Sequence, residues 1–112
     1  MERRVEPRLG EMEQLVLLAL LRLGDDAYGV AVRRELERRT RRPATFGSVY
    51  TTLARLEAKG LVTSSLGEPT HERGGRRKRY FVLRPAGRRA VAASLRVLRA
   101  MTHGLGPTFE SP

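Results

Sequence analysis

The chain has 112 residues, a length that fits one domain. It has no cysteine, which excludes disulfide scaffolds, thiolate zinc sites and cysteine nucleophiles. Its formal net charge is +10, because 22 Lys and Arg residues stand against 12 Asp and Glu residues. Such an excess is typical of nucleic-acid-binding proteins, but 20 of the cations are Arg, which also fits a GC-rich genome. The positions of the charges are therefore more informative than their number.

Nothing in the sequence indicates a membrane or a secreted protein. The longest apolar run, residues 15–21, is far shorter than the ~18 residues that a spanning helix needs. Residues 1–6 are charged, and no hydrophobic stretch ends at a small-residue cleavage site, so no signal peptide is expected. We expect a cytoplasmic protein with no membrane partner. Residues 1–9 are predicted to form a flexible N-terminal arm.

A first helix is predicted from Gly10, with Gly24 as its C-cap. This segment is apolar nearly all round, so it is expected to be buried on more than one side. In a chain this small, the simplest second cover is a partner chain.

A second helix is predicted over 27–40, with Asp25 or Asp26 as its N-cap. Residues 33–42 hold six Arg against two Glu. These charges are expected to form a solvated face with i,i+4 pairs such as Glu35–Arg39.

A third helix is predicted over 46–59, with Thr45 as N-cap and Gly60 as its stop. Its apolar stripe is narrow, and its outer face is small, hydroxylic and cationic instead of carrying the Glu and Lys residues of an ordinary solvent face. The outer face comprises Gly47, Ser48, Thr51, Ala54, Arg55 and Ala58, with Tyr50 on one flank.

Two short β-rich runs, 61–66 and 79–83, predict a hairpin with a long basic tip. Residues 73–79 hold five cations and no acid. One alternative is that these charges only protect an edge strand from aggregation, but one or two charges suffice for that.

A fourth helix is predicted over 85–102, with Pro85 at its first position. Its apolar stripe (Val91, Leu95, Leu98, Met101) is broader than one small core requires. Residues 104–112 contain Gly, Pro and Ser and are expected to be disordered.

The order of elements predicts a mainly α fold with a small β-hairpin: a winged helix-turn-helix over 10–84, followed by a C-terminal dimerisation helix over 85–103. In this fold the third helix enters the major groove of DNA, and the hairpin, called the wing, contacts the backbone or the minor groove. The predicted DNA-binding residues are Gly47, Ser48, Tyr50, Thr51, Arg55, Arg73, Arg76, Arg77, Lys78 and Arg79.

Several segments resemble the PadR family of bacterial transcriptional regulators. Residues 47–62 (GSVYTTLARLEAKGLV) resemble its recognition-helix block, and residues 74–81 (GGRRKRYF) resemble its wing. Further matches are the apolar run 15–21 ahead of Tyr28-Gly29, and Leu83 followed by Gly87-Arg88-Arg89. The likeness covers about residues 10–100. One departure from the family pattern is Arg84, where the family usually has a Thr that caps the fourth helix. The absence of this cap is expected to cost about 1 kcal/mol of helix stability.

The resemblance implies a homodimeric repressor on a near-palindromic operator, often released by a small molecule. It also implies that the fourth helix, helped by the first, forms the dimer. The predicted interface residues are Leu17, Leu21, Val91, Leu95, Leu98 and Met101.

Other classes of function fit less well. The two histidines lie in a predicted wing and a predicted tail, and no metal-ligand cluster, nucleophile motif or phosphate-cradling loop is present, so neither an enzyme nor a cofactor is expected. A sequence-blind architectural DNA-binding protein and an RNA-binding protein stay open, although the aromatic platform typical of RNA modules is missing. No effector can be named: without Trp, a pocket would depend on residues such as Met12 and Met101, for which a plain dimer core is the simpler role.

Two residues have alternative roles. The Tyr50 hydroxyl can meet a DNA phosphate, or the ring can close the gap between the second and third helices. Arg55 can contact DNA or pair with acids near Glu57, but residues two apart do not face each other on a helix, which favours DNA.

Overall fold

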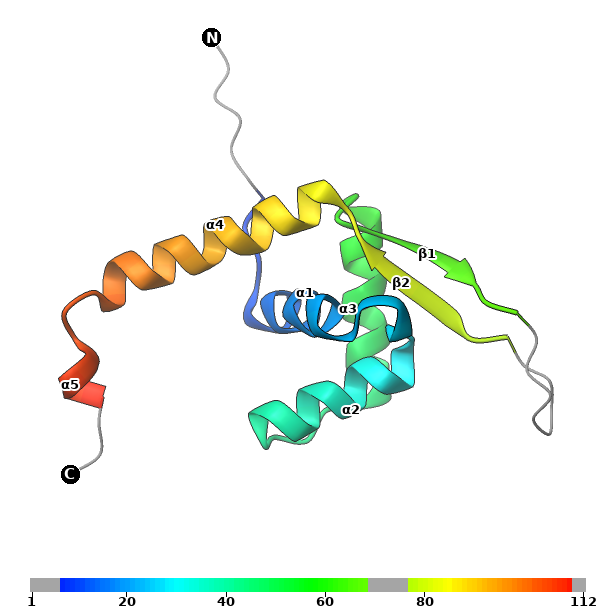
Figure 1. Cartoon of the computed structure of the whole chain (residues 1–112), viewed down its shortest axis with the longest axis horizontal. Coiled ribbons are helices and arrows are strands. Elements are labelled where there is room, and N and C mark those ends of the chain that lie inside the picture. Colours follow the sequence, from blue (N-terminus) through cyan, green and yellow to red (C-terminus); the bar gives the residue numbers. More distant parts are fainter. Residues whose placement is uncertain (1–6, 69–76, 110–112) are drawn as a thin grey trace, which may run out of the picture.

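A computed structural model describes residues 7–68 and 77–109 of the chain. Three helices come first: α1 (Glu11–Leu23), α2 (Gly29–Thr40) and α3 (Phe46–Ala58), with a 3-10 turn at Gly24–Asp26 after α1. The hairpin of β1 (Val62–Leu66) and β2 (Arg79–Leu83) follows, and then α4 (Pro85–Thr102) and a single turn, α5 (Gly106–Phe109). In Figure 1 the hairpin extends from one side of the three-helix body and α4 from the other. The predicted order of elements and the mainly α fold are confirmed.

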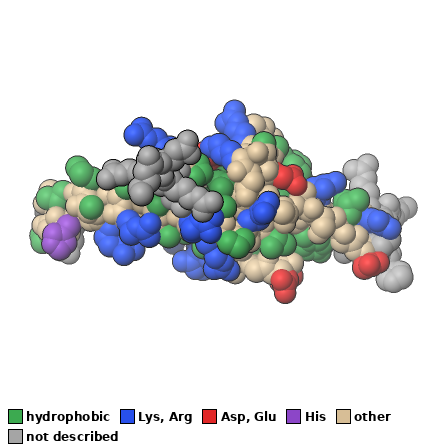
Figure 2. Space-filling model, turned by 90° about the horizontal axis from the view of Figure 1, so that it is seen from above, with side chains coloured by type: hydrophobic (Ala, Val, Ile, Leu, Met, Phe, Trp, Pro, Cys, Tyr) green, Lys and Arg blue, Asp and Glu red, His purple; other side chains and the backbone are tan. Residues whose placement is uncertain are grey.

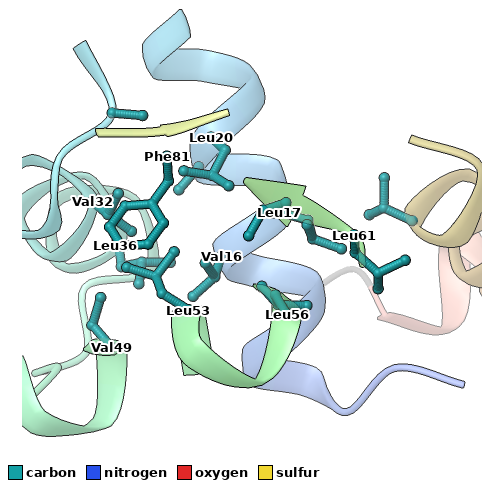
Figure 3. Close-up of a cluster of buried hydrophobic side chains, with 14 of the residues drawn as sticks. Val16, Leu17, Leu20, Val32, Leu36, Val49, Leu53, Leu56, Leu61 and Phe81 are labelled. Atoms are coloured by element: carbon teal, nitrogen blue, oxygen red, sulfur yellow. The ribbon is translucent and has the colours of Figure 1, made fainter. Parts of the chain in front are cut away.

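One hydrophobic core holds α1, α2, α3 and the base of the hairpin together. It forms because each helix turns its apolar stripe inward, and β2 adds the Phe81 ring, which is 4% exposed. Figure 3 shows these side chains meeting from α1 (Val16, Leu17, Leu20), α2 (Val32, Leu36), α3 (Val49, Leu53, Leu56), Leu61 and Phe81.

Local signals fix the ends of α3 as predicted. The Thr45 side chain accepts a hydrogen bond from the Ser48 backbone N–H at 3.1 Å, which satisfies one free donor of the first turn. At the other end, Gly60 has φ +75°, a conformation that favours glycine and turns the chain into β1.

The predicted cap of α2 is wrong. Asp25 and Asp26 lie in the 3-10 turn, and the N-cap is Tyr28, without a side-chain cap. The reason is tertiary: Ala27 is buried, its carbonyl accepts a hydrogen bond from the Phe81 N–H at 2.8 Å, and Tyr28 forms a β-bridge with Tyr80. These contacts keep Ala27 and Tyr28 out of the helical conformation, with Tyr28 extended, so that α2 begins only at Gly29.

The hairpin and the start of α4 are packed closely. The strands pair antiparallel, with Val62 opposite Leu83 and Leu66 opposite Arg79. The Arg84 N–H donates to the Leu61 carbonyl at 2.9 Å, and a Cβ on Gly87 would lie 2.3 Å from that same oxygen. Helix α4 starts at Pro85 with no side-chain cap from Arg84, as the sequence predicts.

The first part of α4 packs on the core and the rest leaves it. Ala90 and Val91 are buried, whereas the residues from Arg96 onward are exposed. The segment expected to be disordered contains α5, although residues 110–112 lie outside the described part. The arm was predicted over 1–9; of it, only 7–9 are described, without helix or strand, and Leu9 packs against the core.

The predicted dimer residues divide into two groups. Leu17 is 0% exposed and Val91 is 3% exposed, so both belong to the core of their own chain and are not available to a partner. Leu21, Leu98 and Met101 are exposed, and Leu95 is half-buried. In the described part of the chain, no helix has the length and apolarity needed to cross a membrane.

Candidate nucleic-acid interface

The outer face of α3 is exposed and made of small residues, as predicted. Gly47, Ser48 and Thr51 near its N-terminus are exposed, while Val49 and Leu53 on the opposite side are fully buried. A surface of small side chains lets the helix backbone approach a partner closely. The helix thus presents a face suited to the floor of a groove.

Arg55 lies on this face one turn further along. Its side chain is exposed and forms no hydrogen bond or salt bridge with another described residue. The nearby acid Glu57 instead accepts a hydrogen bond from Ser64. A pair between Arg55 and Glu57 is therefore not seen, although the charge of the exposed Arg55 helps to lower the pKa of the Glu13 carboxyl on α1.

Tyr50 packs between α3 and its neighbours. Its ring centroid lies 4.5 Å from that of Phe46 and 6.4 Å from that of Phe81. The ring also lies against Gly29 of α2, where an added Cβ would be 2.6 Å from the nearest ring atom. The packing alternative is thus what the structure contains, and a contact of Tyr50 with DNA stays a prediction.

The described part of the wing base is cationic and is attached to the body by aromatic contacts. The Lys78 ammonium lies 4.3 Å from the centroid of the Tyr28 ring, and the Tyr28 and Tyr80 rings meet edge to face at 5.7 Å. Arg77 and Arg79 are exposed. Arg73 and Arg76, also predicted to bind DNA, lie outside the described residues.

A hollow of about 330 Å³ lies between the wing and the start of α2. Its lining combines aromatic rings with cations: Tyr28, Gly29, Val30, Tyr50, Leu66, Arg77, Lys78 and Arg79. The first backbone bond of α2 runs from Val32 N–H to the Tyr28 carbonyl, so the N–H groups of residues 29–31 have no partner within the helix. Free N–H groups and cations together favour a phosphate.

The start of α2 is part of this surface, although it is not among the predicted DNA-binding residues. The signal was present in Tyr28-Gly29, since a glycine at a helix start allows a close approach of another group.

The Arg-rich end of α2 is a solvated, paired face. Glu35 accepts from Arg38 Nη2 at 2.8 Å and from Arg39 Nε at 2.6 Å, which confirms the predicted Glu35–Arg39 pair. These two hydrogen bonds hold the pKa of the Glu35 carboxyl below its ordinary value. Arg42 pairs with Glu11 of α1 at 2.8 Å. Much of this positive charge is therefore offset within the chain.

Figure 2 shows one face of the molecule, with Lys and Arg side chains along most of its length and few acidic ones. Over residues 7–68 and 77–109, no group of three or more His, Cys, Asp or Glu side chains is placed to hold a metal ion.

Three packed helices, an exposed small-residue face on the third and a two-stranded hairpin beside it define a winged helix-turn-helix protein. Residues 17–93 match the model of the transcriptional regulator PadR-like family. Since this match spans more than half of the chain, the chain belongs to the PadR-like family of transcriptional regulators, as the sequence resemblance indicated.

Solved structures support the fold. A PadR family transcription regulator from Clostridium difficile superposes with a TM-score of 0.73 at 21% identity, covering 90% of this chain and 100% of that one. A PadR family transcriptional regulator from Eggerthella lenta gives a TM-score of 0.66 at 25% identity, covering 88% and 84% of the two chains.

A curated relative is longer. An uncharacterised 37.1 kDa transposon protein of Streptomyces fradiae is 36% identical over 104 residues, which is 93% of this chain. The chain spans only 27% of that relative's length.

Proposed function

We propose that the chain binds double-stranded DNA in a sequence-specific way and acts as a homodimeric repressor on a near-palindromic operator. The observation that carries the DNA part is the exposed face of α3, where Arg55 forms no hydrogen bond or salt bridge with another described residue and lies beside small side chains. In the major groove, Arg pairs with the O6 and N7 atoms of guanine. The hollow between α2 and the wing then receives the phosphates of the flanking backbone.

The homodimer part rests on the far half of α4. Large apolar side chains there are exposed in the single chain: Val97 at 64%, Leu98 at 49% and Met101 at 73%, followed by Leu105 and Phe109. The stripe that begins in the core at Val91 continues past the edge of that core through Leu95 and Leu98. A second copy covers such a stripe by two-fold symmetry, which also matches a near-palindromic site.

The proposal does not extend to a small-molecule effector. The hollows between α1 and α2 measure about 180 and about 120 Å³. Typical ligand pockets measure roughly 300–1,000 Å³. The larger hollow beside the wing is the one assigned above to phosphates.

A binding panel tests the proposal. Fluorescence anisotropy compares wild type and Arg55→Ala on duplex DNA, single-stranded DNA and single-stranded RNA of equal length, over a range of salt. We expect duplex preference, a steep loss of affinity with salt, and loss of sequence preference in Arg55→Ala. Preference for single-stranded RNA would instead support the RNA-binding alternative and contradict the proposal.

A further inference from the structure

Three polar side chains form a hydrogen-bonded chain from the recognition helix to the wing. Arg79 Nη1 on β2 donates to Ser64 Oγ on β1 at 3.1 Å, and Ser64 Oγ donates to Glu57 Oε2 on α3 at 2.7 Å. A serine hydroxyl has one proton, so Ser64 can serve both neighbours only in this order. The direction runs from the cation through the hydroxyl to the carboxylate.

The strand register brings these groups to one face. Ser64 pairs with Phe81, and Arg79 lies two residues from Phe81 on the same face of β2. Arg79 is thus the diagonal neighbour of Ser64, within reach of a long side chain. A hollow of about 200 Å³ lies beside the chain, lined by Tyr50, Ala54, Glu57, Arg79 and Phe81. The three hydrogen-bonded side chains therefore link the edge of the candidate interface on α3 to the part of the interface on the wing.

The presence of a carboxylate at this edge needs a reason, because it repels DNA phosphates. Glu57 is exposed and lies on the helix that carries Arg55. Simple electrostatics makes it unfavourable for binding. The one side-chain hydrogen bond that it accepts within the described residues comes from Ser64.

We propose that Glu57 and Ser64 are positioning residues that aim the Arg79 guanidinium at the DNA backbone beside α3. This inference rests on the proposed DNA-binding function. Arg has five N–H donors, so the bond to Ser64 leaves others for a phosphate. Holding the long side chain in one direction before binding lowers the entropy cost of ordering it on DNA.

The test uses Ser64→Ala, which breaks both hydrogen bonds without changing the net charge. Ser65→Ala is the matched control, because Ser65 is the same residue type one position along, is exposed and is in the same strand. Affinity is measured by anisotropy for a duplex selected from a random pool. We expect Ser64→Ala to weaken binding roughly threefold to tenfold, the effect of about one hydrogen bond, and Ser65→Ala to leave it unchanged.

Two further readouts separate positioning from a general structural effect. Ser64→Thr keeps the hydroxyl and suits a strand, so it is expected to restore wild-type affinity. The slope of log K against log salt is expected to stay at the wild-type value in Ser64→Ala, because the cation is still present, and to become shallower by about 0.9, the value of one phosphate contact, in Arg79→Ala. If Ser64→Ala and the wild type differ in melting temperature, a second variant, Glu57→Ala, is tested. It is expected to weaken DNA binding even though it makes the protein more positive.

A double-mutant cycle with Arg79→Ala closes the test. Ser64→Ala is expected to have no further effect in the Arg79→Ala background, because Ser64 acts only through the Arg79 side chain. Three results would overturn this inference while leaving the proposed function intact. The first is equal DNA affinity of Ser64→Ala and Ser65→Ala. The second is a loss of affinity from Ser64→Ala that is just as large in the Arg79→Ala background, and the third is tighter specific binding by Glu57→Ala. Absence of any duplex selected by the wild type would overturn the proposed function and the inference with it.

Discussion

The exposed stripe on α4 makes a quantitative prediction about the dimer. Leu98 is 49% exposed in the single chain, so about half of its side chain is left to bury in a partner. Complete burial of a Leu side chain is worth about 1.5–3 kcal/mol, so half is worth about 0.7–1.5 kcal/mol per copy. Because a two-fold axis doubles every substitution, truncation to Ala is expected to weaken the dimer by about 1.5–3 kcal/mol, or roughly 10-fold to 150-fold in Kd.

Leu98→Asp is expected to have a larger effect, since the dimer would have to bury two carboxylates without partners. Light scattering coupled to size exclusion, over a range of protein concentrations, gives the mass directly. Ala100→Asp is the matched control: it adds the same charge two positions on, about 200° round the helix from Leu98, at a position that is also exposed. A dimeric Leu98→Asp, or a monomeric Ala100→Asp, would refute the assignment of this stripe as the interface.

The remaining predictions concern the DNA-binding face and the stability of the body. Arg55→Ala should lower specific affinity by roughly 1–3 kcal/mol and relax preference at one base position, as measured by competition with mutated duplexes. Gly87→Ala should destabilise the chain by about 1–3 kcal/mol in urea unfolding, because its Cβ would meet the Leu61 carbonyl at 2.3 Å; Gly47→Ala, with nothing within 4 Å of the added Cβ, should not. Glu35→Gln should be less stable than wild type near pH 7, since two arginines of α2 lower the pKa of Glu35 when folded. That difference should be fully present above the ordinary Glu value of about 4.5 and should disappear as the pH falls through the lower pKa of the folded carboxyl; a difference that persists in stronger acid would contradict this cause.

The elements with strong local signals could be predicted from the sequence. Thr45 and Gly60 bracket α3, and the 4-3 spacing of Val49, Leu53 and Leu56 sets its buried side. Pro85 marks the start of α4 even without a side-chain cap. In each case the cause lies within a few residues of the effect.

The predictions that are wrong concern features that are set by contacts between residues far apart in the sequence. Asp25 and Asp26 have the right chemistry for a cap, but the bond from Phe81 to Ala27 delays α2. Because α1 is apolar on nearly all sides, its sequence does not show which of its residues face the core of the same chain. Leu17 is one of those that do. Likewise, the Arg79–Ser64–Glu57 chain depends on strand register across a long loop.

The central claim is sequence-specific recognition of duplex DNA by a dimer. Selection of binders from random duplexes, at about 150 mM salt where the screening length is near 8 Å, tests it most directly. We predict enrichment of an inverted repeat whose half-sites are about 34–36 Å apart, which is one helical turn, or a multiple of that distance. Strong binding with no enriched sequence would contradict the claim and would support an architectural role carried by charge alone.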